Sequence, residues 1–122
     1  HWTATEFLRD TPWPTAPAIQ DAYTERERMR AAILAQMEPY AAILSPPCSI
    51  TGFRHRERRY EVAGKSISQF AAMALATPWN LFGFPALVVP CAGSSVQLIG
   101  HPFEDHALLE LGGQLGSQDP AQ

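Results

Sequence analysis

The stretch NLFGFPALVVP, residues 80–90, constrains the fold of this chain more than any other segment. Gly83 and Pro85 precede a short apolar run, which Pro90 closes. Glycine permits a positive φ or a close backbone approach where a helix ends, and proline cannot continue a helix. An apolar run without alternation is typical of a strand that is buried on both faces. The stretch therefore predicts a helix end, a turn and a buried strand in direct succession.

Helical patterns and apolar runs alternate along the rest of the chain. Apolar residues at three- and four-residue spacing predict a long helix over 18–38, which Pro39 ends. Its exposed face should carry the charges Glu25, Arg26, Glu27, Arg28 and Arg30. Further helices are expected at about 3–10, 67–79 and 103–115, the last ended by Gly112 and Gly113, and strands at about 41–45, 84–89 and 96–99. Residues 48–66 are predicted to form a loop with a basic patch.

Strands interleaved with helices predict an α/β fold, with a mostly parallel or mixed, buried sheet of about three strands and helices on its faces. A chain of 122 residues is one domain at most. Three strands would leave the edges of such a sheet exposed, and the sequence begins without Met. We therefore expect residues 1–122 to be one segment of a larger single domain.

Composition argues against several classes of protein. The net charge of −3 does not suit a nucleic-acid-binding protein, which needs a basic excess on one face. The longest apolar run is far shorter than the roughly 20 residues of a membrane span, and no secretory signal is visible. Cys48 and Cys91 are too few for a disulfide framework, and we expect buried or half-buried thiols in a reducing compartment. These features predict a cytoplasmic protein with no nucleic-acid or membrane partner.

Three blocks of sequence, in order, carry a family resemblance: YAAILSPP, then TPWNLFGFPALVVPC, then VQLIGHPFEDHALLEL. Together they resemble the C-terminal part of the amidase signature family over roughly residues 18–115. The resemblance implies part of an α/β/α layered fold. The chain departs from the family pattern where AGSS replaces a longer hairpin, where SPP replaces TPT, and where Phe82 replaces a common small Thr.

The resemblance also implies an amide hydrolase with a Ser–cis-Ser–Lys triad and with no cofactor or metal. In the family, the lysine and the glycine- and serine-rich segment precede the part represented here. Lys65 is the only lysine of the chain, and its AGKSIS context does not match the family lysine. We therefore expect no catalytic residue within this chain.

Other chemical motifs in the sequence are weak. AGKS at 63–66 resembles the end of a phosphate-binding loop, but Arg59 stands where that motif needs glycine. AGSS at 92–95 joins two predicted strands, which favours a tight turn over a nucleophile loop. His101 and His106 are five residues apart, which does not place them on one helical face, and no Cys or carboxylate joins them at zinc spacing. The arginine-rich stretch at 53–60 is either a solvated loop or a docking patch for an acidic surface.

The candidate site residues lie where the predicted helix ends before the buried strand. Thr77, Trp79, Asn80 and Phe82 are expected to border a substrate channel, with Pro78 interrupting the helical hydrogen bonds there. Trp79 offers an apolar face with one N–H donor, and Asn80 can both donate and accept. The alternative is that Trp79 and Phe82 only pack under the sheet.

Three functions stay open at this point. The first is the C-terminal segment of an amidase that acts on a small-molecule amide, together with the remaining N-terminal part of the domain. The second is a catalytically inactive remnant that serves as a structural or protein-interaction module. The third is a piece similar to the amidotransferases that transamidate charged transfer RNA, which would need a partner subunit.

Overall fold

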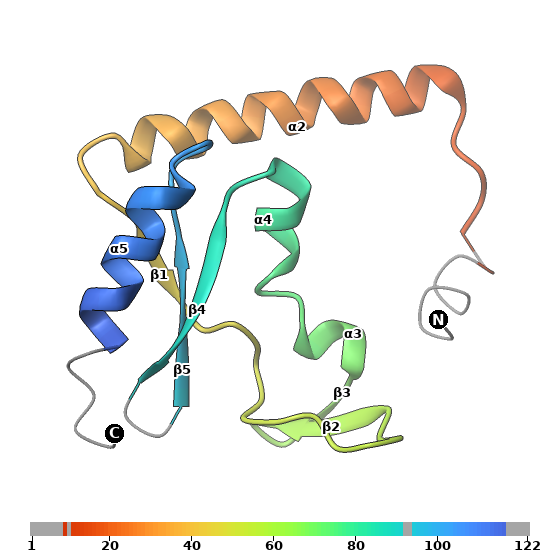
Figure 1. Cartoon of the computed structure of the whole chain (residues 1–122). Helices are drawn as coiled ribbons and strands as arrows, with labels where there is room; N and C mark the ends of the chain where they lie inside the picture. Colours follow the sequence, from red (N-terminus) through yellow and green to blue (C-terminus); the bar gives the residue numbers. More distant parts are fainter. Residues whose placement is uncertain (1–8, 10, 92–93, 117–122) are drawn as a thin grey trace.

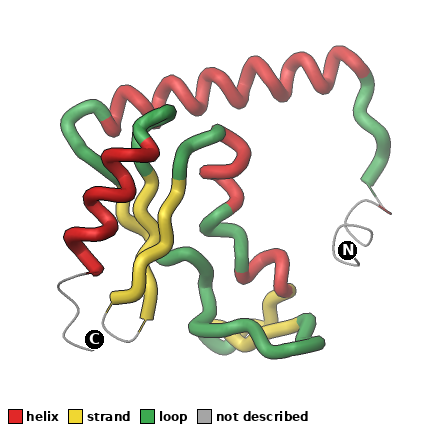
Figure 2. Tube along the Cα trace, in the orientation of Figure 1, coloured by secondary structure: helices red, strands yellow, loops and turns green. Residues whose placement is uncertain are grey.

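A computed structural model of the chain describes residues 9, 11–91 and 94–116. A long helix, α2, lies across one end of a three-stranded sheet, with helix α5 on one side of the sheet and helix α4 on the other (Figure 1). A small two-stranded hairpin lies at the opposite end from α2 (Figure 2). The helix predicted at 3–10 lies almost entirely outside the described residues.

Helix α2 spans Ala16–Met37, close to the predicted 18–38. Thr15 caps its first turn, because the Thr15 side chain accepts a hydrogen bond from the Ala18 N–H at 3.4 Å. Pro17 lies in the first turn, where its missing N–H leaves no helical bond unmade. Glu25 and Arg28, both predicted on the exposed face, form an i,i+3 ion pair of 2.6 Å.

The helix predicted at 67–79 is wrong in its bounds, because two short helices occupy this region. Helix α3 spans Gln69–Ala72, and Ser68 caps it by accepting from the Ala71 N–H at 3.1 Å. Helix α4 spans Thr77–Phe82. Pro78 lies in the first turn of α4, so it starts a helix here instead of ending one.

The three-stranded sheet has the order β1-β5-β4, with β1 at Ile43–Ser45, β4 at Ala86–Cys91 and β5 at Ser94–Ile99. The predicted three strands are therefore present, and helices flank them, which confirms the α/β class. Both pairs are antiparallel, in contrast to the predicted parallel or mixed arrangement. The reason is the short link between β4 and β5, since Cys91 pairs with Ser94 and a parallel pair would need a crossover of a dozen or more residues.

The hairpin of β2 (Arg59–Val62) and β3 (Lys65–Ser68) corrects the prediction of a loop over 48–66. Its two turn residues, Ala63 and Gly64, both have positive φ, at 49° and 74°. Positive φ at both central positions belongs to the type I′ turn that suits two-residue hairpins. The stretch AGKS is therefore part of a hairpin, which excludes the phosphate-binding loop.

Two apolar clusters occupy the two faces of the sheet. One joins α2 and α4 to the sheet and contains Met37, Phe82, Phe84 and Ile99. The other joins α5 to the sheet and contains Val89, Leu98 and Leu108. Alternate residues of β5 point to opposite faces, so this central strand contributes to both clusters.

Helix α5 spans Asp105–Gly116, so it continues through Gly112 and Gly113, where the sequence predicts its end. Gly112 lies against β4, and a Cβ at this position would overlap Leu87 Cδ2 and lie 3.2 Å from Val89 Cγ1. The glycine therefore lets the helix pack closely on the sheet, since any side chain here would displace Leu87. Among the described residues, no helix is both long and apolar enough to cross a membrane.

Candidate functional site

The candidate site is built on α4 and the turn that follows it. Gly83 ends α4 in the left-handed conformation, with φ of 68°, as the sequence predicts for this glycine. The N–H groups of Gly83 and Phe84 both donate to the Trp79 carbonyl, the latter at 3.0 Å. The two hydrogen bonds to this carbonyl hold the turn in place, and the chain leads from α4 directly into β4.

Arg30 of α2 anchors the end of α4. Its Nε donates to the Phe82 carbonyl at 3.0 Å, which satisfies one of the carbonyls left free at a helix end. Its guanidinium lies 5.7 Å from the centre of the Phe84 ring and forms a long ion pair of 3.9 Å with Glu27. The prediction that Arg30 belongs to the exposed face of α2 is therefore wrong, since its side chain is only 27% exposed.

Of the four predicted site residues, two pack against the core and two are exposed. Trp79 and Phe82 are three residues apart, so they share one face of α4 and pack against the cluster around Met37 and Ile99. Thr77 and Asn80 are exposed. Phe82 is 9% exposed and Trp79 is half-buried, so neither aromatic side chain is freely open to solvent.

Asn80 and Phe82 border an open cavity of about 420 Å³ between α4 and α2. Its remaining lining residues are Arg26, Glu27, Arg30, Leu81 and Gly83. Hydrogen bonding from Arg26 lowers the pKa of the Glu27 carboxyl, so this group stays ionised near neutral pH. The cavity therefore presents charged groups from α2 opposite an amide side chain from α4.

Two buried polar atoms, Trp79 Nε1 on α4 and Gln97 Oε1 on β5, lack a hydrogen-bond partner within the described part of the chain. Leaving such a group unpaired costs about 1–3 kcal/mol. Gln97 is 3% exposed and lies on the central strand β5. This residue is absent from the site predicted by sequence, although a lone amide inside the apolar run VQLI is a visible signal.

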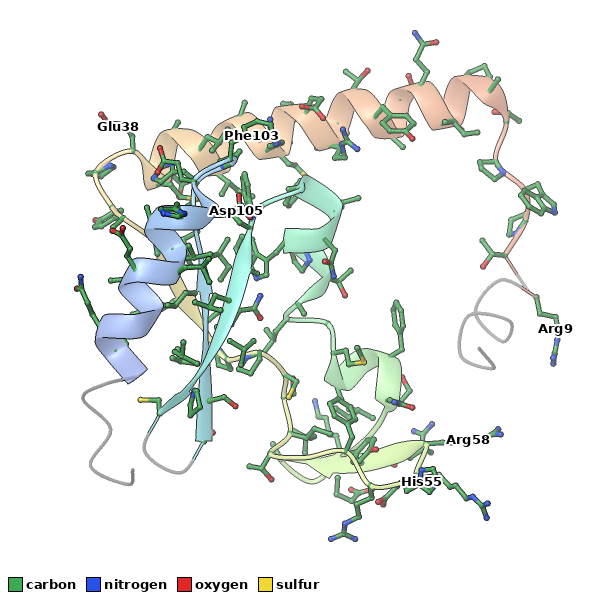
Figure 3. The ribbon with its side chains drawn as sticks, viewed as in Figure 1. Arg9, Glu38, His55, Arg58, Phe103 and Asp105 are labelled. Atoms are coloured by element: carbon green, nitrogen blue, oxygen red, sulfur yellow. The ribbon has the colours of Figure 1, made fainter. Side chains whose placement is uncertain are left out.

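A second open cavity, of about 600 Å³, lies beside the β2–β3 hairpin. Its lining includes Arg54, Glu57, Tyr60 and Glu61, together with residues 49–52. The arginine-rich patch extends from here, and Figure 3 shows His55 and Arg58 projecting at the hairpin end, far from α5. Arg59 is part of the hairpin itself, because it donates to the Ser66 hydroxyl and carbonyl at 3.1 and 2.8 Å.

The lysine and two of the histidines considered in the sequence analysis are either exposed or bound to the main chain. Lys65 is exposed and opens β3, paired with Val62. His101 Nε2 lies 2.9 Å from the Tyr40 carbonyl and links two turns, and His106 is exposed on α5. Within the described ranges, no group of three or more His, Cys, Asp or Glu side chains could hold a metal ion.

The two cysteines are free in this structure, Cys48 half-buried and Cys91 exposed. The exposure of Cys91 contradicts the expected burial. Cys91 ends the edge strand β4, next to the connection to β5, so few side chains cover it.

Replacing Arg30 with Met should lower the free energy of unfolding by about 1–2 kcal/mol, because the charged donor to the Phe82 carbonyl is lost while the aliphatic part remains. Arg28→Met is the matched control, since Arg28 is 68% exposed and pairs only on the surface of α2. We expect it to change stability by less than about 0.5 kcal/mol. Urea unfolding of both variants would measure the difference, and equal losses would show that Arg30 does not anchor α4.

The helix–turn–strand unit on an α/β layer places the chain in a known structural class. A solved structure described as "Crystal structure of amidase" superposes on 97% of this chain with a TM-score of 0.75 and 24% sequence identity. This chain covers 31% of that chain. The likeness shows that the fold is that of an amidase.

Sequence comparison identifies the family. The family model described as Amidase matches residues 12–109, and the chain belongs to this family. It is also 28% identical over 108 residues to the A subunit of glutamyl-tRNA(Gln) amidotransferase from two strains of Staphylococcus epidermidis, ATCC 35984 and ATCC 12228. The match covers 80% of this chain and 21% of each relative, so the chain spans about a fifth of the length of these curated relatives.

Proposed function

We propose that this chain is the C-terminal segment of an amidase domain that hydrolyses carboxamide bonds through a Ser-Ser-Lys mechanism, with the catalytic residues outside residues 1–122. The main support is the Amidase match over residues 12–109 together with the position of Lys65. Lys65 lies exposed in a hairpin, with Val62 as its cross-strand partner, and has no serine-rich loop of the family type beside it. The segment supplies sheet strands and one wall of the substrate channel to the domain.

The exposed apolar side chains support a segment of a larger domain over a stand-alone inactive remnant. Three of them, Ile19, Tyr23 and Met29, are between 43% and 58% exposed on the part of α2 that extends beyond the sheet (Figure 1). Phe70, Met73, Leu75 and Leu81 are 40–54% exposed around α3 and α4. Large exposed apolar areas mark interaction sites. The partner that we propose for them is the remaining N-terminal part of the amidase domain.

The proposed channel wall consists of Thr77, Trp79, Asn80 and Phe82. The cavity beside Asn80 and Phe82 and the half-buried indole of Trp79 support this role. The substrate is a small-molecule carboxamide, no cofactor takes part, and we propose a cytoplasmic location. Neither nucleic acid nor a membrane is required for this activity.

A second candidate function is that of one component of an amidotransferase. The observation that favours it is the 28% identity to the A subunit of a glutamyl-tRNA(Gln) amidotransferase. The two functions differ in the fate of the amide nitrogen, which is released by a hydrolase and transferred to an acyl acceptor by an amidotransferase.

Purified residues 1–122 should show no turnover of acetamide or benzamide, whereas the complete polypeptide that contains them should release ammonia from at least one small amide. Turnover by residues 1–122 would contradict the proposal, and its loss in a Lys65→Ala variant would assign a catalytic role to Lys65. Amide transfer to glutamyl-tRNA(Gln) without net hydrolysis would favour the amidotransferase function. A complete polypeptide without either activity would favour the inactive module.

A further inference from the structure

The cavity between α2 and α4 is lined by more positive than negative charge. Of its seven lining residues, the ionised ones are Arg26, Glu27 and Arg30, which are two cations and one carboxylate. The other lining residues, Asn80 among them, are neutral. The lining therefore has one positive charge that no carboxylate of its own balances.

The single carboxylate of the lining, Glu27, is bonded mainly to Arg26. Its Oε1 atom accepts hydrogen bonds from both Nε and Nη2 of Arg26, the former at 3.0 Å. Its other oxygen, Oε2, lies 3.9 Å from Arg30 Nη1, which is too long for a hydrogen bond. Arg30 is therefore the cation whose charge is balanced least.

The Arg30 guanidinium is held in place without using most of its donors. Its Nε donates to the Phe82 carbonyl, and its plane lies near the Phe84 ring. An arginine has five N–H donors, and the four on the terminal nitrogens of Arg30 make only the long contact with Glu27 among the described residues. A cation that is largely removed from water is normally paired with an anion. The lining of an open cavity by Arg30 gives an anion a route to it.

Helix α4 adds a neutral donor to the same cavity. Asn80 is exposed, and its side-chain NH₂ group can donate hydrogen bonds. The cavity volume of about 420 Å³ lies within the range of small-ligand sites. A partly exposed arginine and an amide donor bordering one such cavity suit an acceptor that has two oxygens and a negative charge.

We propose that this cavity binds one carboxylate group, which pairs with the Arg30 guanidinium and accepts a hydrogen bond from the Asn80 side chain. The planar arginine fork matches the two oxygens of a carboxylate. One such group also balances the unpaired positive charge of the lining. The carboxylate can come from the substrate or from an acidic side chain of the remaining amidase domain. With the substrate as the source, the inference deepens the proposed function, on which it then rests, because it makes amides that carry a carboxylate the preferred class.

Two substitutions with opposite effects on the charge of the lining test the site in the complete polypeptide. Arg26→Gln releases Glu27 to pair with Arg30 and leaves the lining neutral, so it should weaken carboxylate binding. Glu27→Gln removes the only carboxylate of the lining and should strengthen it. If the pair of Arg26 and Glu27 were only structural, removing either partner should act in the same direction. Arg28→Gln is the matched control, because Arg28 pairs with Glu25 outside the cavity.

If the source is the substrate, the polypeptide should prefer succinamate to butanamide, which has a similar length but no carboxylate. Arg26→Gln should lower the ratio of their kcat/KM values about fivefold, the effect of one partly screened charge. Glu27→Gln should raise the ratio by a similar factor, and Arg28→Gln should leave it within twofold.

If the source is the remaining domain, the ratio should stay unchanged and the urea midpoint should respond instead. The midpoint should then fall in Arg26→Gln and rise in Glu27→Gln. Shifts of the same sign in these two variants, with an unchanged ratio, would show that the pair is only structural and would overturn the inference. Variants that behave like Arg28→Gln in both assays would overturn it as well.

A binding measurement keeps the inference testable even if the complete polypeptide hydrolyses no amide, which would contradict the proposed function alone. Succinate, titrated by calorimetry, should bind the wild type, bind Arg26→Gln about fivefold more weakly and bind Glu27→Gln more tightly. No binding of succinate, together with opposite midpoint shifts, would assign the carboxylate to the remaining domain. Succinate binding that is absent or equal in all three proteins, without opposite midpoint shifts, would overturn the inference.

Discussion

Replacing Leu98 with Ala is expected to lower the free energy of unfolding by about 3–5 kcal/mol, in the upper part of the range for emptying a well-packed leucine site. Leu98 has no exposed surface and lies on the central strand β5. It joins β5 to helix α5 through its cluster with Val89 and Leu108. Strands on both sides and a helix above restrict how far the surroundings can collapse into the space left by the side chain.

Leu44 gives a matched control for this substitution within the same ladder. It pairs directly with Leu98 on the edge strand β1 but is 63% exposed. Leu44→Ala should therefore cost less than about 1 kcal/mol, because little apolar surface returns to water. Urea unfolding monitored by circular dichroism would compare the two variants, and similar losses would show that the α5 face of β5 is not the core of the fold.

The sequence predicts best those elements whose patterns depend on local chemistry. The long helix over 18–38 is found at Ala16–Met37, since a continuous apolar spacing and a following Pro39 leave few alternatives. The turn at Gly83 is present as predicted. A strand follows it, but the expected burial on both faces is wrong, because β4 is an edge strand in which only Val89 is buried, and it continues through Pro90 instead of ending there. In each of these cases, residues within one turn or one strand determine the outcome.

The errors arise where position within an element decides the role of a residue. Pro78 suggests a helix end, but proline is also favoured in a first turn, and only the break before Thr77 distinguishes the two. The β2–β3 hairpin escapes prediction because its turn is Ala63-Gly64, and alanine rarely adopts the positive φ that the turn needs. The prediction of a parallel or mixed sheet rests on the alternation of strands and helices. It gives too little weight to the short AGSS link, so the predicted strand direction is wrong.

The candidate site shows the same limit. Sequence reasoning selects Trp79 and Asn80 for their hydrogen-bonding chemistry, but it does not include Arg30, whose role depends on α2 crossing the end of α4. Gln97 is visible in the sequence as a lone amide in an apolar run, but its burial at 3% exposure and its unpaired Oε1 depend on the tertiary packing. Contacts between distant segments, 52 residues apart for Arg30 and Phe82, are not encoded in residue spacing.

The second large effect is expected at Gly112, where a side chain has no room. Gly112→Val should lower the free energy of unfolding by roughly 2–3 kcal/mol, toward the upper end of the usual cost of overpacking. A Cβ alone would overlap Leu87 Cδ2, and the two methyl groups of valine add further bulk against Val89. The Leu87 side chain must therefore leave its rotamer, and the remaining contact with Val89 presses α5 away from β4.

The adjacent glycine separates packing from helix propensity. Gly113 has nothing within 4 Å of an added Cβ, so Gly113→Val should leave stability unchanged or raise it by about 0.5 kcal/mol through the better helix propensity of valine. The two substitutions change the same helix by the same side chain, one residue apart, and differ only in the surface that they face. Opposite or clearly unequal shifts in the urea midpoint would support close packing of α5 on β4, whereas equal shifts would show that Gly112 is needed only for its backbone and not for the contact with the sheet.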